Sequence, residues 1–122
     1  MFGGVQTIVD LLARGRFPLS SEKDCQAEIE AWLGEGLPGV EILREHRLSD
    51  RDRPDFFVTD GGIAIEVKIG GRGQSRAGIV RQLGRYAEHD HVQAIVLVTG
   101  VSILPFRLSK PIHFVSLGRA WL

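Results

Sequence analysis

Residues 55–69 contain two runs of strand-forming residues separated by Asp60-Gly61-Gly62. Glycine adopts the positive φ angles that tight turns need, and an Asp-Gly pair between two such runs is typical of a β-hairpin. The spacing therefore predicts antiparallel strands over residues 55–59 and 63–69. Pro54 precedes the first of these strands, where a proline breaks no hydrogen bond of the sheet.

The remaining segments separate into helical and extended patterns. Apolar residues at helical spacing mark the helices, and Ser21 offers an N-cap for the second of them, with Asp24 three residues later. Gly34, Gly36 and Pro38 are expected to end that helix. The patterns predict helices over 5–14, 21–33 and 75–88, and further strands over 40–47, 93–99 and 112–117.

This order of elements predicts the topology. The first three strands are expected to form an antiparallel meander, and the helix over 75–88 should cross into a strand parallel to 63–69. The fold class is then a three-layer mixed α/β domain. At 122 residues the chain is long enough for one core, so we expect a single domain over residues 1–122.

Cysteine content and hydropathy limit the class of protein. Cys25 is the only cysteine, which excludes an internal disulfide framework and a multi-cysteine zinc site. The longest apolar run, residues 94–98, is far shorter than the roughly 20 residues that span a bilayer, and no leader-like segment opens the chain. We therefore expect no membrane association and a cytoplasmic location.

Charge is divided unevenly along the chain. Residues 1–66 carry seven Lys/Arg and thirteen Asp/Glu, a net −6, whereas residues 67–122 carry eight Lys/Arg and two Asp/Glu, a net +6. A polyanion would favour the basic half. The alternative is a solvated helix face that balances an acidic half. The cationic candidates for contacts with phosphates are Arg72, Arg76, Arg81 and Arg85.

The second strand of the hairpin places two charged residues together. Glu66 and Lys68 share one face of strand 63–69 and leave the sheet about 7 Å apart. Asp55 begins the neighbouring strand and is expected to meet Glu66 across the pair. Taken alone, Glu66 and Lys68 favour an ordinary charge pair on a solvent-facing strand, and it is Asp55 and Glu28 that shift the interpretation toward a site.

Two adjacent carboxylates repel each other, so something must compensate for bringing them together. Mg²⁺ and Mn²⁺ are hard cations that take a few carboxylates and keep several waters, which leaves room for a phosphate. Glu28 borders the apolar stripe of helix 21–33 and is the candidate third carboxylate, unless it pairs with a nearby arginine. Lys68 beside the metal suits the stabilisation of charge at phosphorus.

These residues resemble a known signature. Arg53-Pro54-Asp55, followed after a hairpin by Glu66-Val67-Lys68, is similar to the PD-(D/E)xK motif of the restriction-endonuclease-like nuclease superfamily. The segment from Gln82 to Tyr86 resembles the QxxxY motif of RecB-type members. The resemblance covers about residues 21–100 and implies the superfamily's αβββαβ core. Holliday junction resolvases and small phage-type nucleases are the members most similar in size.

The resemblance implies a metal-dependent deoxyribonuclease. Asp55, Glu66 and Lys68 would be the catalytic residues, with Gln82 and Tyr86 orienting Lys68 or the phosphate backbone. The resemblance also implies Mg²⁺ or Mn²⁺ as the cofactor and DNA as the substrate. The metal ligands that it implies are Glu28, Asp55, Glu66 and the carbonyl group of Val67.

Alternatives remain open at this stage. A non-catalytic nucleic-acid-binding or interaction module on the same fold would need neither metal nor Lys68. A nucleotide-binding α/β domain would use the glycines at 70–73, although Arg76 stands where the dinucleotide motif needs its third glycine. A homodimer is plausible for so short a chain, and Ile103, Phe106, Ile112 and Phe114 either serve such a dimer or complete the monomer core.

Overall fold

The computed structural model describes residues 2–70 and 74–117. Within them the strands form one five-stranded mixed sheet in the order β1-β2-β3-β4-β5. β1, β2 and β3 pair antiparallel, whereas β3, β4 and β5 pair parallel. The helices are α1 (Val5–Arg14), α2 (Glu22–Gly36) and α3 (Arg76–Ala87), and the strands are β1 (Ile42–Arg44), β2 (Phe56–Val58), β3 (Ile63–Lys68), β4 (Ala94–Thr99) and β5 (Ile112–Ser116).

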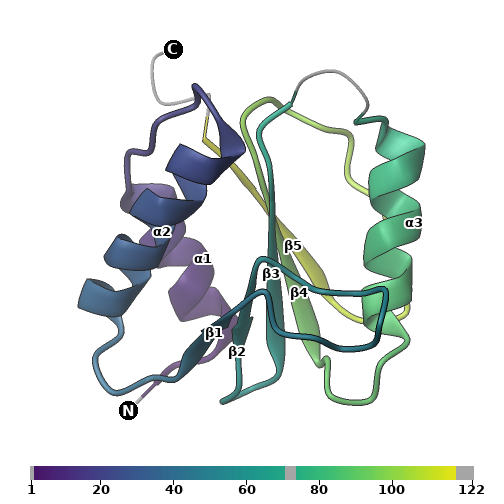
Figure 1. Ribbon diagram of the computed structural model, residues 1–122, viewed down its shortest axis with the longest axis horizontal. Coiled ribbons are helices and arrows are strands. Elements are labelled where there is room, and N and C mark those ends of the chain that lie inside the picture. The colour runs from purple at the N-terminus through teal and green to yellow at the C-terminus, as the bar shows by residue number, and fades with distance from the viewer. Residues whose placement is uncertain (1, 71–73, 118–122) are drawn as a thin grey trace.

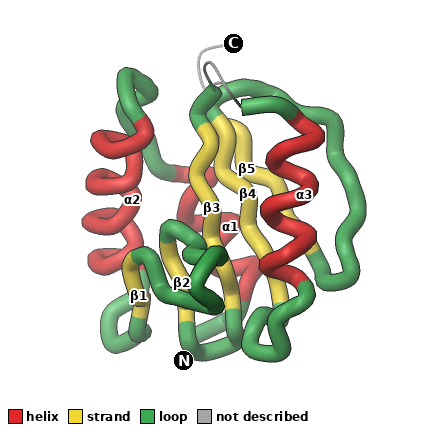
Figure 2. The backbone as a smooth tube through the Cα atoms, turned by 45° about the vertical axis from the view of Figure 1, so that its right-hand side comes forward, coloured by secondary structure: helices red, strands yellow, loops and turns green. Residues whose placement is uncertain are grey.

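The sheet lies between two layers of helix. Figure 1 shows α1 and α2 on one face and α3 on the other. Figure 2 shows α3 alongside β3 and β4, the two parallel strands that it connects. The predicted mixed α/β class, the antiparallel meander and the parallel crossover are confirmed.

Alternation along β3 divides its side chains between two cores. Ile63, Ile65 and Val67 pack in the core that α1 and α2 cover. Ala64 belongs to the core beneath α3. Because successive side chains of a strand point to opposite faces, Glu66 joins Ala64 on the α3 side. The strand therefore directs the charged pair toward α3, as the sequence predicts.

The helix starts follow the predicted caps. Ser21 Oγ accepts a hydrogen bond from the backbone N–H of Asp24 at 3.1 Å, which satisfies one of the unpaired donors of the first turn of α2. This helix continues to Gly36, three residues past its predicted end. Leu33 and Leu37 are both buried, and the Leu37 N–H donates to the Leu33 carbonyl at 2.9 Å. Burial of these leucines therefore outweighs the helix-breaking tendency of the glycines.

The strand predicted over 40–47 is shorter than expected, because only Ile42–Arg44 pair with β2. Glu45 follows with φ of 47°, a left-handed conformation that turns the chain out of the sheet. Leu48 and Ser49 then donate to the carbonyl oxygen of Asp52 in a turn. Residues 45–55 thus form a β1–β2 loop that reaches α3 (Figure 1).

The segment after β4 completes the core beneath α3. Ile103, Phe106, Ile112 and Phe114 are partly buried against it, and the Phe106 and Phe114 rings meet edge to face at 5.2 Å between centroids. Of the two roles predicted for these residues, the structure supports the monomer core. Across the described residues, no helix has the length and hydropathy required to cross a membrane.

Candidate active site

The site begins where β2 and β3 separate. Asp55 directly precedes β2, so its carboxylate replaces the strand as the partner of β3: Oδ2 accepts the Val67 N–H at 2.7 Å. The N–H of Asp55 donates to Glu66 Oε1 at 3.2 Å. The predicted meeting of Asp55 and Glu66 across the hairpin is therefore present, and each carboxylate is held by a hydrogen bond from a backbone N–H of the other strand segment.

Glu66 is the centre of the contacts. It is only 3% exposed, and its two oxygens have different partners. Oε1 lies 3.1 Å from the Tyr86 hydroxyl, and Oε2 lies 3.3 Å from Lys68 Nζ. Lys68 is also largely buried, so the ion pair is screened little by solvent.

Burial shifts the acidity of both carboxylic acids. Loss of hydration raises the pKa of Asp55 to about 6, although the Val67 N–H and Lys68 act in the opposite direction. Burial and the neighbouring Asp55 charge raise the pKa of Glu66 to about 7. Near neutral pH the metal-free pair therefore holds part of a proton instead of two full negative charges.

Tyr86 orients Glu66. Its hydroxyl has two acceptors for one proton, Glu66 Oε1 and the Arg53 carbonyl oxygen, which is 3.2 Å away. Gln82, one turn earlier on α3, donates to the Tyr86 oxygen at 3.1 Å. Burial and the Glu66 charge raise the pKa of Tyr86, so the phenol stays protonated. The sequence predicted that Gln82 and Tyr86 lie at the site but assigned Lys68 or the phosphate as the group they orient. In the structure Tyr86 contacts Glu66, and Gln82 contacts Tyr86.

The prediction that Glu28 packs toward the sheet is wrong. Glu28 is exposed and lines a shallow surface depression with Pro18, Asp24 and Ala27. The acidic residue of α2 that acts on the site is Glu22, whose charge raises the pKa values of Asp55 and Cys25. Spacing contains the signal for this, because Glu22 is three residues before buried Cys25 and seven before buried Ile29.

Gln74 connects Glu22 to the residues that follow β3. Its Nε2 donates to Glu22 Oε2 at 2.5 Å across 52 residues of sequence. Its Oε1 is buried and has no hydrogen-bond partner among the described residues. Sequence reasoning did not include Gln74, and no local pattern identifies it, since the contact is between distant segments.

The four predicted phosphate-binding arginines have different surroundings. Arg76 donates to the carbonyl oxygens of Leu104 and Pro105, and its guanidinium lies over the Phe106 ring. Arg85 forms an ion pair with Asp52, and Arg81 is exposed on α3. Arg72 lies outside the described residues.

Asp52 is a buried anchor that sequence reasoning missed. Its side chain is 6% exposed, with Oδ1 2.9 Å from Arg85 Nε and Oδ2 3.0 Å from His89 Nε2. Burial alone would raise the pKa of Asp52, but the hydrogen bonds from His89 and Arg85 outweigh it and hold that pKa below its usual range. Asp52 thus fastens the β1–β2 loop to the end of α3, three residues before Asp55.

A groove of about 370 Å³ runs along α3 beside this site. Lys68 and Gln82, which both contact site residues, form part of its wall. The other residues that line it are Arg51, Gln74, Ser75, Gly78, Ile79, Arg81 and Arg85. Four of its lining residues are cationic and, among the residues described, none is acidic, so the groove favours an anion.

The donor atoms fit a hard divalent cation. The Asp55 and Glu66 carboxylates are close enough that the charge of Asp55 raises the pKa of Glu66, and Gln74 Oε1 is a buried oxygen with no hydrogen-bond partner within residues 2–70 and 74–117. Within residues 2–70 and 74–117, no three His, Cys, Asp or Glu side chains converge closely enough to hold a metal ion by themselves. Mg²⁺ commonly uses one or two carboxylates and fills its remaining positions with waters and substrate phosphate oxygens.

We compared the chain with known protein families, curated proteins and solved structures. No family model, curated protein or solved structure matches the chain. The geometry of the site is therefore the basis for a function.

Proposed function

We propose that the protein is a divalent-metal-dependent nuclease that hydrolyses phosphodiester bonds of DNA. The observation that carries this proposal is the convergence of Asp55, Glu66 and Lys68 at one end of the sheet. The backbone N–H of Asp55 donates to one Glu66 oxygen, Lys68 pairs with the other, and the Asp55 carboxylate accepts the N–H of the residue after Glu66. Burying two acids together destabilises a fold unless a bound partner uses them. Mg²⁺ or Mn²⁺ is the partner that such oxygens suit.

Asp55 and Glu66 would hold the metal ion, with the Val67 carbonyl group as a further ligand and Glu22 adding negative charge from α2. A bound Mg²⁺ or Mn²⁺ ion would lower the pKa of a water molecule and polarise the phosphate.

Lys68 would act on the phosphate. In hydrolysis a water oxygen bonds to phosphorus, the bond from phosphorus to one ester oxygen breaks, and a proton ends on the departing oxygen. Lys68 can stabilise the negative charge that develops at phosphorus, because Glu66 fixes its ammonium group beside the carboxylates. Tyr86 and Gln82 would keep Glu66 in the orientation that this arrangement needs.

We expect recognition of the DNA backbone or of branched structure, such as a Holliday junction, more than recognition of base sequence. The described residues form one sheet with its helices, and the cationic groove beside the site suits phosphates, which carry no sequence information. A homodimer would present two sites to branched or duplex DNA.

Cleavage of labelled DNA tests the proposal. Single-stranded, linear duplex, supercoiled, flap and four-way junction substrates are incubated with Mg²⁺, Mn²⁺ or EDTA. We expect cutting only with metal and a loss of about 100-fold or more in Lys68→Ala. Lys23→Ala, an exposed lysine on α2, is the matched control and should cut normally.

Two results would contradict the proposal. Cutting that persists in EDTA would contradict a role for the metal. Cutting that Lys68→Ala retains at the normal rate would contradict a role for Lys68. If folded protein cuts no substrate but binds DNA, and Asp55→Ala leaves that binding unchanged, the chain is a non-catalytic binding module.

A further inference from the structure

We infer that the groove along α3 binds a backbone phosphate of the DNA strand next to the bond that is cut, and that Arg51 and Arg81 are its contact residues. The inference rests on the proposed function and adds a defined binding site to it. Arg81 lies on α3, within the basic half of the sequence, whereas Arg51 lies on the β1–β2 loop, in the acidic half.

The position of the groove connects it to the candidate active site. Lys68 and Gln82 belong to both: Lys68 pairs with Glu66, and Gln82 bonds Tyr86, which contacts Glu66. A strand whose phosphate lies at Asp55 and Glu66 can therefore continue into the groove. Its volume of about 370 Å³ is at the lower end of ligand pockets, which suits about one nucleotide of a single strand and not an enclosed duplex.

Charge at the groove is arranged for an anion. Arg85 is held at its wall through Nε, which pairs with buried Asp52 and leaves the terminal guanidinium nitrogens uninvolved in that bond. Arg51 and Arg81 are exposed, and within the described residues neither guanidinium takes part in an ion pair or hydrogen bond. Their charge is therefore available to a ligand, unlike that of Arg76, which binds two carbonyl groups.

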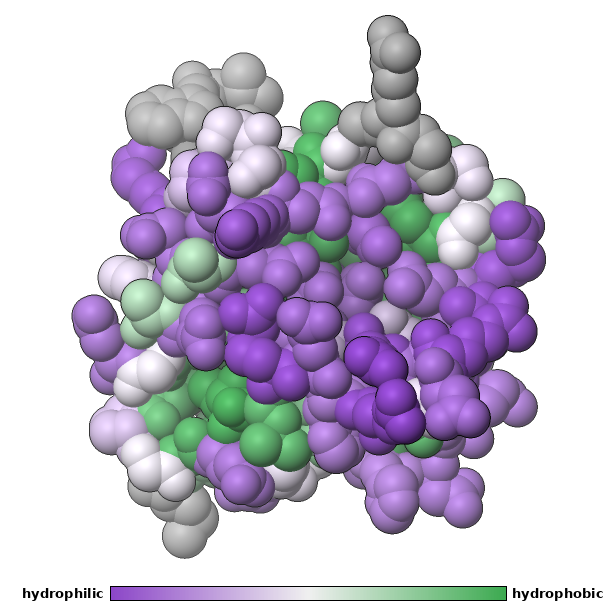
Figure 3. Space-filling view, in the orientation of Figure 1, coloured by the Kyte–Doolittle hydropathy of each residue, from purple (hydrophilic) through white to green (hydrophobic). Residues whose placement is uncertain are grey.

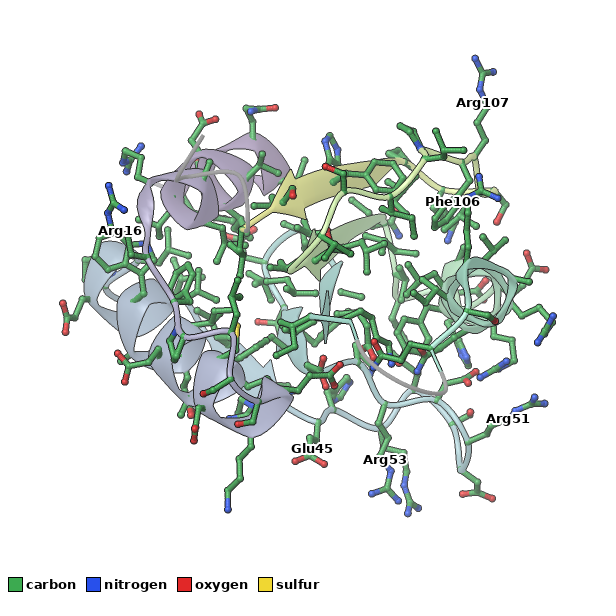
Figure 4. The ribbon with its side chains drawn as sticks, turned by 90° about the horizontal axis from the view of Figure 1, so that it is seen from above. Arg16, Glu45, Arg51, Arg53, Phe106 and Arg107 are labelled. Atoms are coloured by element: carbon green, nitrogen blue, oxygen red, sulfur yellow. The ribbon has the colours of Figure 1, made fainter. Side chains whose placement is uncertain are left out.

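The surface around the groove agrees with this assignment. Figure 3 shows hydrophilic side chains gathered over the β1–β2 loop and the adjoining face of α3. Figure 4 shows Arg51 and Arg53 projecting outward from that loop, while Arg107 projects from the opposite side of the molecule. Arg107 is exposed and does not line the groove, so it provides a matched control.

The test compares Arg51→Ala, Arg81→Ala, the double variant and Arg107→Ala. Affinity for a fluorescent single-stranded oligonucleotide is measured in EDTA across a range of salt concentrations, and cleavage is measured in Mn²⁺. We expect each groove variant to bind about tenfold more weakly at moderate salt. The slope of log affinity against log salt should decrease by about 0.7 for each arginine removed. Arg107→Ala should match the unchanged protein.

The outcomes separate this inference from the proposed function. If the protein cuts DNA but the groove variants bind like Arg107→Ala, the groove assignment is overturned and the nuclease proposal stands. If no DNA is cut and binding still depends on Arg51 and Arg81, the groove stands and the nuclease proposal fails. Equal loss of affinity in all three single variants would indicate an effect of net charge alone and would also overturn the groove assignment.

Discussion

At the scale of single residues, Glu66 is the most buried of the charged residues that the structure describes, and it makes three polar contacts at the site. Its oxygens accept from the Asp55 N–H and the Tyr86 hydroxyl and pair with Lys68. A carboxylate in this position is costly for the metal-free fold, because burial raises its pKa from 4.5 to about 7. We interpret that cost as the consequence of keeping a charged ligand ready for a cation.

Stability should therefore fall as pH rises. In EDTA the folded protein binds more protons than the unfolded chain between pH 4.5 and 7, so the free energy of unfolding decreases across that window. For Glu66 alone the decrease is on the order of 3 kcal/mol. Urea denaturation at pH 5 and pH 8 measures it, and equal or greater stability at pH 8 would contradict the expectation.

Glu66→Gln should separate function from stability. The amide carries no charge to bury, so at pH 8 in EDTA we expect an increase on the order of 2 kcal/mol in the free energy of unfolding, together with loss of metal-dependent cleavage. Glu28→Gln is the matched control: its side chain is exposed, and stability should change by less than about 0.5 kcal/mol. A destabilised Glu66→Gln protein would show instead that the charge supports the fold.

Tyr86→Phe tests the residue that orients Glu66. Removing the hydroxyl deletes its contacts with Glu66 Oε1 and the Arg53 carbonyl while leaving the buried ring in place. Because such supporting hydrogen bonds commonly affect metal affinity or activity by 10–100-fold, we expect cleavage to decrease by about that factor. The loss of stability should be about 1 kcal/mol. Titration of activity against Mn²⁺ concentration, with melting curves, measures both effects; an unchanged Mn²⁺ dependence and rate would contradict this role.

At the scale of elements, the site depends on how the β1–β2 loop meets α3. The loop carries Asp52, which binds Arg85 and His89 at the end of α3, and Arg53, whose carbonyl group contacts Tyr86. These contacts hold α3 over the end of β3 where Glu66 lies. Lys110 adds two hydrogen bonds just past this helix end by donating to the carbonyl oxygens of His89 and Val92.

Asp52→Asn should weaken the connection between the loop and α3. One amide cannot accept from both Arg85 and His89 as the carboxylate does, and breaking charged hydrogen bonds of this kind costs about 2 kcal/mol. We expect a lower free energy of unfolding in urea and reduced cleavage. Asp50→Asn on the same loop is the control, because its pair with Arg47 is solvent-exposed and should contribute little. Equal effects in both variants would contradict the anchoring role.

At the scale of the whole molecule, the sequence determines some features and not others. The order of elements and the meeting of Asp55 with Glu66 follow from local signals, namely hydrophobic periodicity and a two-glycine turn that sets the register. The rotation of α2 about its own axis, which decides which of its carboxylates faces the sheet, was predicted incorrectly. The apolar stripe of α2 consists of Cys25, Ile29, Trp32 and Leu33. At 100° per residue, Glu22 lies about 35° from the centre of this stripe, whereas Glu28 lies about 85° from it on the other side.

Contacts between segments far apart in the sequence could not be predicted from local patterns. Asp52 and Arg85 are 33 residues apart, and Gln74 and Glu22 are 52 apart. No local pattern distinguishes a buried aspartate from its exposed neighbour Asp50. The division of the arginines into structural ones and available ones likewise depends on the folded chain, since Arg76 and Arg81 lie on the same helix.

Binding of Mn²⁺ is the measurement that tests the central claim most directly. Calorimetric titration at pH 6.5, in two buffers with different ionisation enthalpies, gives the stoichiometry and the protons released. We expect one Mn²⁺ per chain and release of about one proton, because the pKa values of Asp55 and Glu66 are raised to about 6 and about 7. Glu66→Gln should abolish both signals and Glu28→Gln neither. No binding, or binding that survives in Glu66→Gln, would contradict a metal site at this pair.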